Sequence, residues 1–283
     1  MIDTIIFTKD RACQLDLLLQ SIVKNGNNLF NINILYEASS QEYKDGYLKV
    51  SERFPSYERF NWVEEEDFEK DTLELLNKSG KLVCFFVDDN ILYRPLELNQ
   101  EEVEDIVDDD IFCLSLRLGG NTVVQSEYDN SMCVLPSQVT LINDTFLAWD
   151  WRHLPPFTNF SYPFSVDGHI YRREEVLKIV SQYEFVTPNA FEGMAYANTG
   201  CLGNAPSRMT CLKRSVLVNT PLNLVGSSEN KSGQKFGKSL QELNEEYLSG
   251  NIPDFDGMDF SEVRGCHQEI EIKFKRESDV RAS

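Results

Sequence analysis

The sequence predicts an α/β protein built around a mostly parallel, doubly wound sheet with flanking helices. Short apolar runs alternate with segments of helical spacing through the first 90 residues, the order expected for parallel strands joined by crossover helices. One run, Val83–Val87, ends directly in Asp88, Asp89 and Asn90. In such sheets, ligands bind beyond the carboxyl ends of the strands, so this segment marks the place of a site.

The elements of the first half follow from apolar runs, helical periodicity and stop signals. Strands are predicted at Thr4–Thr8, Ile32–Tyr36, Phe60–Val63 and Val83–Val87. Helices are predicted at Leu15–Val23, Ser39–Phe54 and Phe68–Asn77, and Gly26, Pro55 and Gly80 stop them.

The second half is less regular. Helices are predicted at Glu101–Val107, Arg173–Tyr183 and Leu240–Leu248, and strands at Ile111–Arg117 and Val216–Asn219. Residues 125–165, rich in aromatics and prolines, are expected to form irregular structure around a pocket, and 226–237 a mobile loop. We therefore expect a ligand-binding half at 1–120, a second half of the same domain at 121–275 and a disordered tail at 276–283.

Composition argues against several classes of function. The formal net charge of −19 disfavours nucleic acid as a partner, because a phosphate backbone requires a basic face. No leader is expected, and no apolar run approaches the roughly 20 residues that span a bilayer. The seven cysteines form no Cys-x-x-Cys pair, which favours free buried thiols in a reducing cytoplasm over a zinc site.

Three acidic clusters compete as ligand sites. The run 108–110 precedes a predicted strand and so lies at the wrong edge of a parallel sheet, where a solvated loop is expected. Asp254 and Asp256 follow a proline in a glycine-rich stretch and suggest a turn. Asp88 and Asp89 follow a buried strand, and hard cations such as Mg²⁺ combine carboxylates with substrate phosphates. Asp88 and Asp89 therefore predict a site for a metal ion and a nucleotide; the alternative is that one of them caps the N-terminus of a helix.

The order of three motifs resembles that of GT-A fold glycosyltransferases, especially the family 2-like members. Those proteins begin with a strand and a Thr/Ser-x-x-Arg loop, here Thr8 to Arg11, and their second strand ends in an acidic residue, here Glu37. Their DxD motif follows a hydrophobic strand, as Asp88–Asn90 does here. The resemblance extends over residues 1–120 and implies a GT-A fold with an irregular, acceptor-side second half.

The resemblance implies residues for the donor and for a metal. The nucleoside pocket is expected at Thr8, Asp10, Arg11 and Glu37, and ribose and metal contacts at Asp88 and Asp89. Mn²⁺ or Mg²⁺ is the expected cofactor, held by Asp89 or Asn90 and completed by a C-terminal histidine, His267. Asn90 departs from the family pattern, because an uncharged amide stands where a carboxylate is usual.

Three carboxylates of the second half are candidates for a catalytic base. Glu192 begins a possible helix and resembles the first residue of the Glu-Asp motif that supplies the base in many members, although Gly193 replaces the second carboxylate. Asp167 lies in an Asp-Gly turn, and Asp150 lies between two tryptophans whose faces could stack on a sugar. Each has a purely structural alternative: Glu192 as an acid at a helix N-terminus, Asp167 as a turn residue and Asp150 as a surface acid. Glu192 ranks first.

The leading expectation is a metal-dependent, inverting glycosyltransferase that moves a sugar from a UDP-, GDP- or dTDP-linked donor to a glycan or lipid-linked hydroxyl. Lys231, Lys235 and Lys238 are candidates for a lid over the diphosphate, or for a solvated loop. A nucleotidyltransferase is disfavoured, because the loop after the first strand has no glycine. The sequence also leaves open a retaining transferase and a non-catalytic glycan- or partner-binding module.

Overall fold

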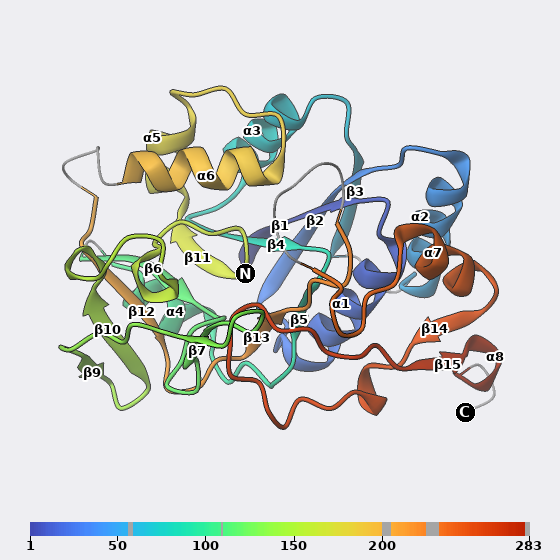
Figure 1. The fold of residues 1–283 in the computed structure, drawn as a ribbon. Coiled ribbons are helices and arrows are strands. Elements are labelled where there is room, and N and C mark those ends of the chain that lie inside the picture. Colours follow the sequence, from blue (N-terminus) through green and yellow to red (C-terminus); the bar gives the residue numbers. More distant parts are fainter. Residues whose placement is uncertain (56–58, 109, 200–204, 225–231, 281–283) are drawn as a thin grey trace.

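A computed structural model describes residues 1–55, 59–108, 110–199, 205–224 and 232–280 of the chain (Figure 1). Within them, a nine-stranded sheet has the order β3-β2-β1-β4-β11-β6-β12-β10-β9. Its strands are β1 (Ile2–Lys9), β2 (Phe30–Glu37), β3 (Phe60–Glu64), β4 (Leu82–Val87), β6 (Ile111–Ser115), β9 (Thr140–Ile142), β10 (Phe146–Asp150), β11 (His169–Arg172) and β12 (Arg208–Leu212).

Three strand pairs lie outside this sheet: β5 (Asn90–Leu92) with β13 (Leu217–Asn219), β7 (Val124–Ser126) with β8 (Ser131–Met132), and β14 (Asn251–Pro253) with β15 (Phe274–Arg276). The helices are α1 (Ala12–Asn25), α2 (Gln41–Arg53), α3 (Phe68–Lys78), α4 (Gln100–Ile106), α5 (Arg173–Val180), α6 (Pro188–Thr199), α7 (Leu240–Leu248) and α8 (Glu277–Val280). Short 3-10 turns are η1 (Trp151–His153), η2 (Asn159–Ser161) and η3 (Phe255–Gly257).

The first half agrees with the sequence prediction. Strand β1 pairs in parallel with β2 and β4, and β2 pairs in parallel with β3. Alternate residues of β1 face opposite sides: Ile2 and Ile6 pack with α1, whereas Ile5 and Phe7 pack with α3 and α6. The sheet is therefore covered on both faces, as Figure 1 shows, and its fold class is the predicted α/β type.

The second half departs from the expectation of irregular structure at 125–165. Strands β9 and β10 lie there and extend the central sheet, and β10 pairs antiparallel with β12. The strand β11 is inserted antiparallel between β4 and β6. The pairings of β10 with β12 and of β11 with β4 and β6 join segments far apart in sequence, so no local pattern predicts them.

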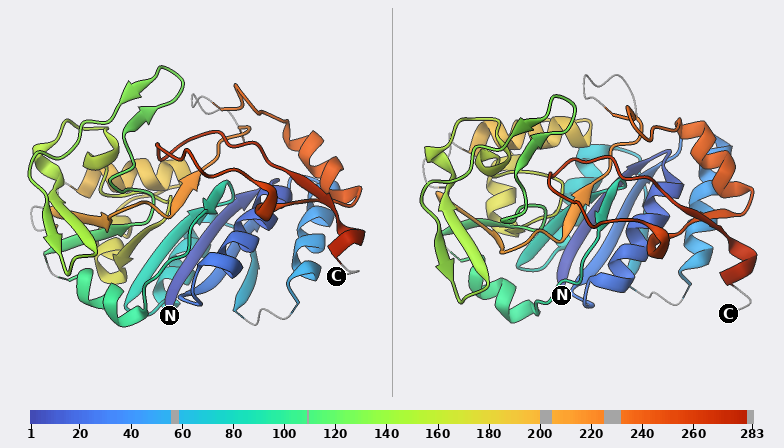
Figure 2. Two further views of the ribbon diagram at one scale, coloured as in Figure 1. Left: turned by 90° about the horizontal axis from the view of Figure 1, so that it is seen from below. Right: turned by 60° about the horizontal axis from the view of Figure 1, so that its bottom comes forward.

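The C-terminal segment crosses the α1 side of the sheet (Figure 2). There β14 contacts both α1 and α7. Within the tail expected to be disordered at 276–283, the described residues include the short helix α8, and residues 281–283 lie outside the description. The N–H of Glu277 donates to the carbonyl of Gly250 at 3.0 Å and its carboxylate pairs with Lys49 at 3.3 Å. Across the described ranges, every helix is too short or too polar to cross a bilayer.

Candidate active site

The carboxyl ends of β1, β2 and β4 bring the predicted donor residues to one edge of the sheet. Thr8 lies near the end of β1, Glu37 ends β2, and Asp88 follows β4. The N–H of Asp88 donates to the carbonyl of Phe7 at 3.2 Å, which holds the end of β4 beside that of β1. This is the edge at which parallel α/β sheets bind ligands.

Arg11 lies over the two acidic residues. Its guanidinium donates to Asp88 Oδ1 at 2.9 Å and to Asp89 Oδ2 at 3.1 Å. All three side chains are close to fully buried, with exposed fractions of 11%, 5% and 9%. The same guanidinium donates to the carbonyl of Asn223 at 2.6 Å, so it joins the first strands to the C-terminal half.

Two carboxylates share this single guanidinium. Burial raises the pKa of Asp88, and it raises the pKa of Asp89 to about 6, in both cases against the opposing charge of Arg11. One cation cannot fully compensate two buried anions, and each carboxylate disfavours ionisation of the other. The cluster therefore has a surplus of negative charge that a further cation or a hydrogen-bond donor can stabilise.

The other residues predicted to bind the nucleoside lie at the same edge of the sheet. Thr8 Oγ1 lies 2.8 Å from the hydroxyl of Tyr47, and Asp10 Oδ1 accepts the N–H of Ser39 at 2.7 Å. Asp10 has a left-handed backbone with φ of 57°, which directs the chain from β1 into α1. At the rim, Glu37 pairs with Lys9 at 2.7 Å and is 39% exposed. Glu37 is thus the donor-side carboxylate most open to a ligand among these residues.

Asp167 is the centre of a second polar cluster. Its Oδ1 accepts from the amides of Asn90 at 3.1 Å and Asn219 at 3.3 Å. Its Oδ2 lies 3.0 Å from both the Arg117 guanidinium and His267 Nε2. Burial alone would raise the pKa of Asp167, but the hydrogen bond and charge of His267 and the charge of Arg117 bring it well below its usual range. Asp167 is therefore held as an anion and is a weak base.

The antiparallel insertion of β11 creates this cluster. Asp167 precedes β11, and the N–H of Gly168 donates to the carbonyl of Phe85 in β4 at 2.8 Å. The amino end of β11 thereby lies beside the carboxyl end of β4. Asn219 then links the two clusters, since its amide also donates to Asp89 Oδ1 at 2.6 Å.

Arg117 and Asn219 are site residues that the sequence reasoning missed. Each lies at the end of a predicted strand, Ile111–Arg117 and Val216–Asn219 respectively. Asp88 was selected because it is a polar side chain at the carboxyl end of a strand. The same criterion selects Arg117 and Asn219.

Glu192 lies in the first turns of α6 and faces the Asp167 cluster. Its Oε1 accepts the N–H of Val166 at 3.1 Å. Burial and then the charge of Asp167 raise the pKa of Glu192. A carboxylate with a raised pKa is a better proton acceptor than Asp167, whose pKa is low and whose two oxygens already accept four hydrogen bonds. Between Glu192 and Asp167, Glu192 has the electrostatics better suited to that role.

Asp150 stabilises the start of the 3-10 turn η1. Its carboxylate accepts the N–H of Arg152 at 2.9 Å and caps η1. Of its neighbours, Trp149 is only 2% exposed and its indole N–H donates to the carbonyl of Phe160 at 2.7 Å. The expectation that a sugar stacks on both tryptophans is therefore wrong for Trp149, whose ring is packed in the core.

The predicted metal ligands Asp89, Asn90 and His267 do not form one coordination shell. Asn90 is fully buried, its amide donates to Asp167, and its carbonyl accepts the N–H of Val87 at 3.0 Å. His267 Nε2 is directed at Asp167, and Asp89 at Arg11 and Asn219. Among the described residues, no group of three or more His, Cys, Asp or Glu side chains is arranged to hold a metal. In this arrangement the three predicted ligands bond to other groups of the chain and do not converge on one point.

The lysines expected to form a lid pair with carboxylates of the chain. Lys235 pairs with Glu127 at 2.5 Å and Lys238 with Glu246 at 2.5 Å; Lys231 lies outside the described residues. The carboxylate of Glu269 accepts three consecutive backbone N–H groups, from Gln234 at 2.7 Å and residues 235 and 236 at 2.8 and 3.0 Å. These bonds anchor the described part of the loop beside the site.

The competing acidic clusters are used structurally. Asp108 Oδ1 accepts the N–H groups of Asp110 and Ile111 at the amino end of β6, as expected of a loop. Asp254 pairs with Lys275 at 2.7 Å, and Asp256 pairs with Lys24. Among the described residues the cysteines are unpaired; Cys201 lies outside them.

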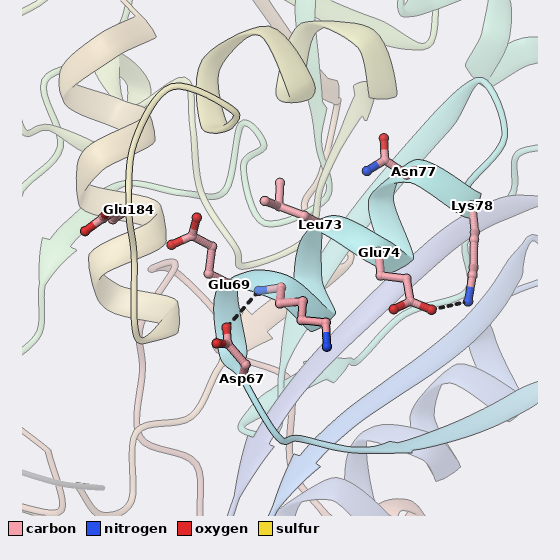
Figure 3. A pocket seen from close by; sticks show the side chains of 8 residues that line it. Asp67, Glu69, Leu73, Glu74, Asn77, Lys78 and Glu184 are labelled. Atoms are coloured by element: carbon pink, nitrogen blue, oxygen red, sulfur yellow. Dashed lines mark hydrogen bonds and ion pairs between the residues drawn. The ribbon is translucent and has the colours of Figure 1, made fainter.

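A surface hollow runs along α3 and is shown in Figure 3. Its lining is mostly charged and includes Asp67, Glu69 and Lys78, together with Glu184. Asp67 caps α3 and Lys78 pairs with Glu74 at 2.5 Å, so these charges have local uses. The hollow contains none of the predicted site residues.

Comparison with known proteins supports the resemblance drawn from the motifs. The chain is similar to the bifunctional glycosyltransferase pgtA of Dictyostelium discoideum, with 28% identity in an alignment of 202 residues that covers 62% of this chain and 24% of that protein. The chain thus spans about a quarter of the relative's length. No protein-family model matches the chain.

Two solved structures show weaker similarity. TarS 1–349 of S. aureus in complex with UDP-GlcNAc aligns with a TM-score of 0.45 and 15% identity, over 86% of this chain and 64% of that one. The mannosyltransferase PcManGT of Pyrobaculum calidifontis, in complex with GDP-Man and Mn²⁺, aligns with a TM-score of 0.42 and 12% identity, over 76% and 54%. With scores and identities this low, neither similarity bears on function.

Proposed function

We propose that this chain, a relative of the glycosyltransferases with a GT-A type of fold, transfers a sugar from a nucleotide-sugar donor to a hydroxyl of a glycan or glycolipid. The observation that carries the proposal is the link between two clusters: Asn219 donates to Asp89 on the donor side and to Asp167 beside Glu192. Donor residues at 1–120 and acceptor residues at 121–275 then meet at one edge of the sheet. The proposed setting is polysaccharide biosynthesis in the cytoplasm, which agrees with the free thiols of the described residues.

In the proposed reaction Glu192 is the general base. Its carboxylate accepts the proton of the acceptor hydroxyl while that oxygen bonds to the anomeric carbon of the donor. The bond from the anomeric carbon to the diphosphate breaks, and its electron pair leaves with the nucleoside diphosphate. Attack opposite the leaving group inverts the anomeric configuration. A product with retained configuration would instead support a retaining transferase, and Asp167 and Asp150 are the next candidates for the base.

The donor is proposed to lie against Thr8, Asp10, Arg11 and Glu37, with its ribose hydroxyls on Asp88 and Asp89. Hydroxyl groups donate to carboxylates, and such charge-assisted bonds are stronger than neutral ones. The surplus negative charge of the Asp88–Asp89 pair favours these donors. Arg11, held between the pair and Asn223, is the cation placed to meet the diphosphate.

Replacing Asp89 with alanine tests the donor site. Asp88 still pairs with Arg11 in this variant, so the guanidinium keeps a partner and the fold should persist. We expect the affinity for the nucleoside diphosphate to fall by roughly 10- to 100-fold, the effect of losing charge-assisted bonds. Isothermal titration with UDP, GDP and dTDP measures it. Asp110→Ala, an exposed aspartate at the opposite edge, is the matched control. Unchanged affinity in Asp89→Ala would remove Asp89 from the donor site.

Dependence on Mn²⁺ or Mg²⁺ is proposed from the resemblance, with Asp89 as the first ligand to test. No step of the reaction is assigned to the ion, because the three predicted ligands have other partners in this structure. We expect EDTA to abolish nucleotide release from the donor and Mn²⁺ to restore it. Full activity after EDTA treatment would contradict metal dependence.

A non-catalytic binding module is the second candidate, favoured by Asn90 in place of a carboxylate and by Gly193 in place of the second acid of the Glu-Asp motif. Such a module binds a nucleotide or a glycan without turnover. Measurement of nucleotide release separates the two, because only the enzyme produces free nucleoside diphosphate.

A further inference from the structure

An exposed aromatic residue with an unusual backbone lies in the loop between η1 and η2. Phe157 is 74% exposed and has φ of 63°, in the left-handed region that bulky residues rarely adopt. Its N–H donates to the hydroxyl of Tyr196 at 3.1 Å. Single exposed hydrophobic residues are common on protein surfaces, but a strained one that is held in place suggests a function.

Phe157 is the outer member of a row of three rings. Its ring centroid lies 5.2 Å from that of Tyr196, and Tyr196 stacks on Tyr162 at 4.2 Å with an interplanar angle of 16°. Tyr162 and Tyr196 are partly buried, so the row extends from the body of the protein to solvent.

The row is adjacent to the proposed base. Tyr196 follows Glu192 by four residues in α6, so the two side chains share one face of the helix. Burial raises the pKa of the Tyr162 hydroxyl, and the negative charge of Glu192 raises it further. This effect of Glu192 indicates that its carboxylate lies near the phenol. Tyr196 and Tyr162 therefore both lie near Glu192.

We propose that Phe157, Tyr196 and Tyr162 form an acceptor subsite for a pyranose ring. One face of a pyranose presents C–H groups, and these pack against the electron-rich face of an aromatic ring while the hydroxyl groups stay solvated or bonded. The ring lies on Phe157 and Tyr196 and directs one hydroxyl toward Glu192. This inference rests on the proposed function, because it supplies the acceptor side of the same site.

Binding of simple sugars without a donor tests the subsite. The probes are the methyl pyranosides of glucose, galactose, mannose and N-acetylglucosamine, measured by saturation-transfer NMR with the full chain. We expect Phe157→Ala to weaken binding by about 3- to 10-fold, the typical effect of one aromatic contact. Phe157→Trp should retain it. Leu48→Ala, an exposed apolar residue on α2, should have no effect.

Phe157→Gly separates recognition from a purely structural role. Glycine adopts positive φ without strain, so this variant should keep or raise the Tm while its sugar binding is weakened as much as in Phe157→Ala. A fall in Tm with unchanged binding would overturn the proposal, as would equal binding by wild type and Phe157→Ala, or no binding of the four glycosides by wild type. Because no nucleotide is present, absent donor turnover with intact, Phe157-dependent sugar binding would contradict the proposed transferase alone.

Discussion

Replacement of Glu192 with glutamine is expected to lower the rate of sugar transfer by about 10²- to 10⁴-fold and to leave donor affinity unchanged. The amide keeps the size of the side chain and can still accept the N–H of Val166, so the local structure should persist. It cannot accept the proton of the acceptor hydroxyl. Transfer is measured as acceptor-dependent nucleotide release, and donor binding by titration calorimetry.

A control variant and the pH dependence of the rate make the Glu192→Gln prediction specific. Glu184→Gln, at an exposed glutamate shortly before α6, is the matched control and should be fully active. Burial and Asp167 raise the pKa of Glu192, so the acidic limb of the wild-type rate profile should lie above the pKa of about 4.3 of a free glutamate. Full activity of Glu192→Gln would exclude Glu192 as the base and direct attention to Asp167 and Asp150.

The largest expected effect on stability is that of Asp167→Asn. Arg117 is only 3% exposed and pairs with Asp167 at 3.0 Å. Removing one partner leaves a buried charge uncompensated, which costs about 3 kcal/mol or more in the free energy of unfolding. Urea denaturation measures the loss. The double variant Asp167→Asn with Arg117→Met removes both charges and should recover most of the stability.

The pH dependence of that effect has a defined sign. The folded-state pKa of Asp167 lies below the unfolded value of about 3.9, so its ionised form stabilises the fold above that pH. The contribution is lost as the pH falls through the folded-state pKa. Wild type and Asp167→Asn should therefore differ most near neutral pH and converge in acid. A constant difference across this range would show that lost packing, not lost charge, explains the variant.

The parallel half of the fold was predictable because its signals are local. Buried strands such as Val83–Val87 are short apolar runs, and the helices between them end at glycine or proline. Strand polarity then placed Asp88 and Asp89 at the ligand edge and the run 108–110 at the opposite one. The structure agrees for Asp88 and Asp89 and for Asp108 and Asp110; residue 109 lies outside the described residues.

The Asp167 cluster was not predictable as a unit, because it depends on sheet order. Residue 167 lies 77 positions after Asn90, and they meet only because β11 enters the sheet antiparallel beside β4. The pairing of β11 with β6 likewise brings Asp167 to Arg117, whereas Asn219 and His267 come from β13 and from the bridge between residues 219 and 267. His267 and Arg117 then lower the pKa of Asp167. The sequence ranks Glu192 above Asp167 as the candidate base, and the partners of Asp167, which lower its pKa, make it a weak proton acceptor.

The central claim is that this chain turns over a nucleotide sugar at the edge formed by β1 and β4. It is tested most directly by the release of nucleoside diphosphate from UDP-, GDP- and dTDP-sugars in the presence of Mn²⁺, with wild type and Glu192→Gln side by side. We predict release by wild type from at least one donor, and binding without release by Glu192→Gln. No release of nucleoside diphosphate by wild type from any of these donors, with or without binding, would contradict the claim.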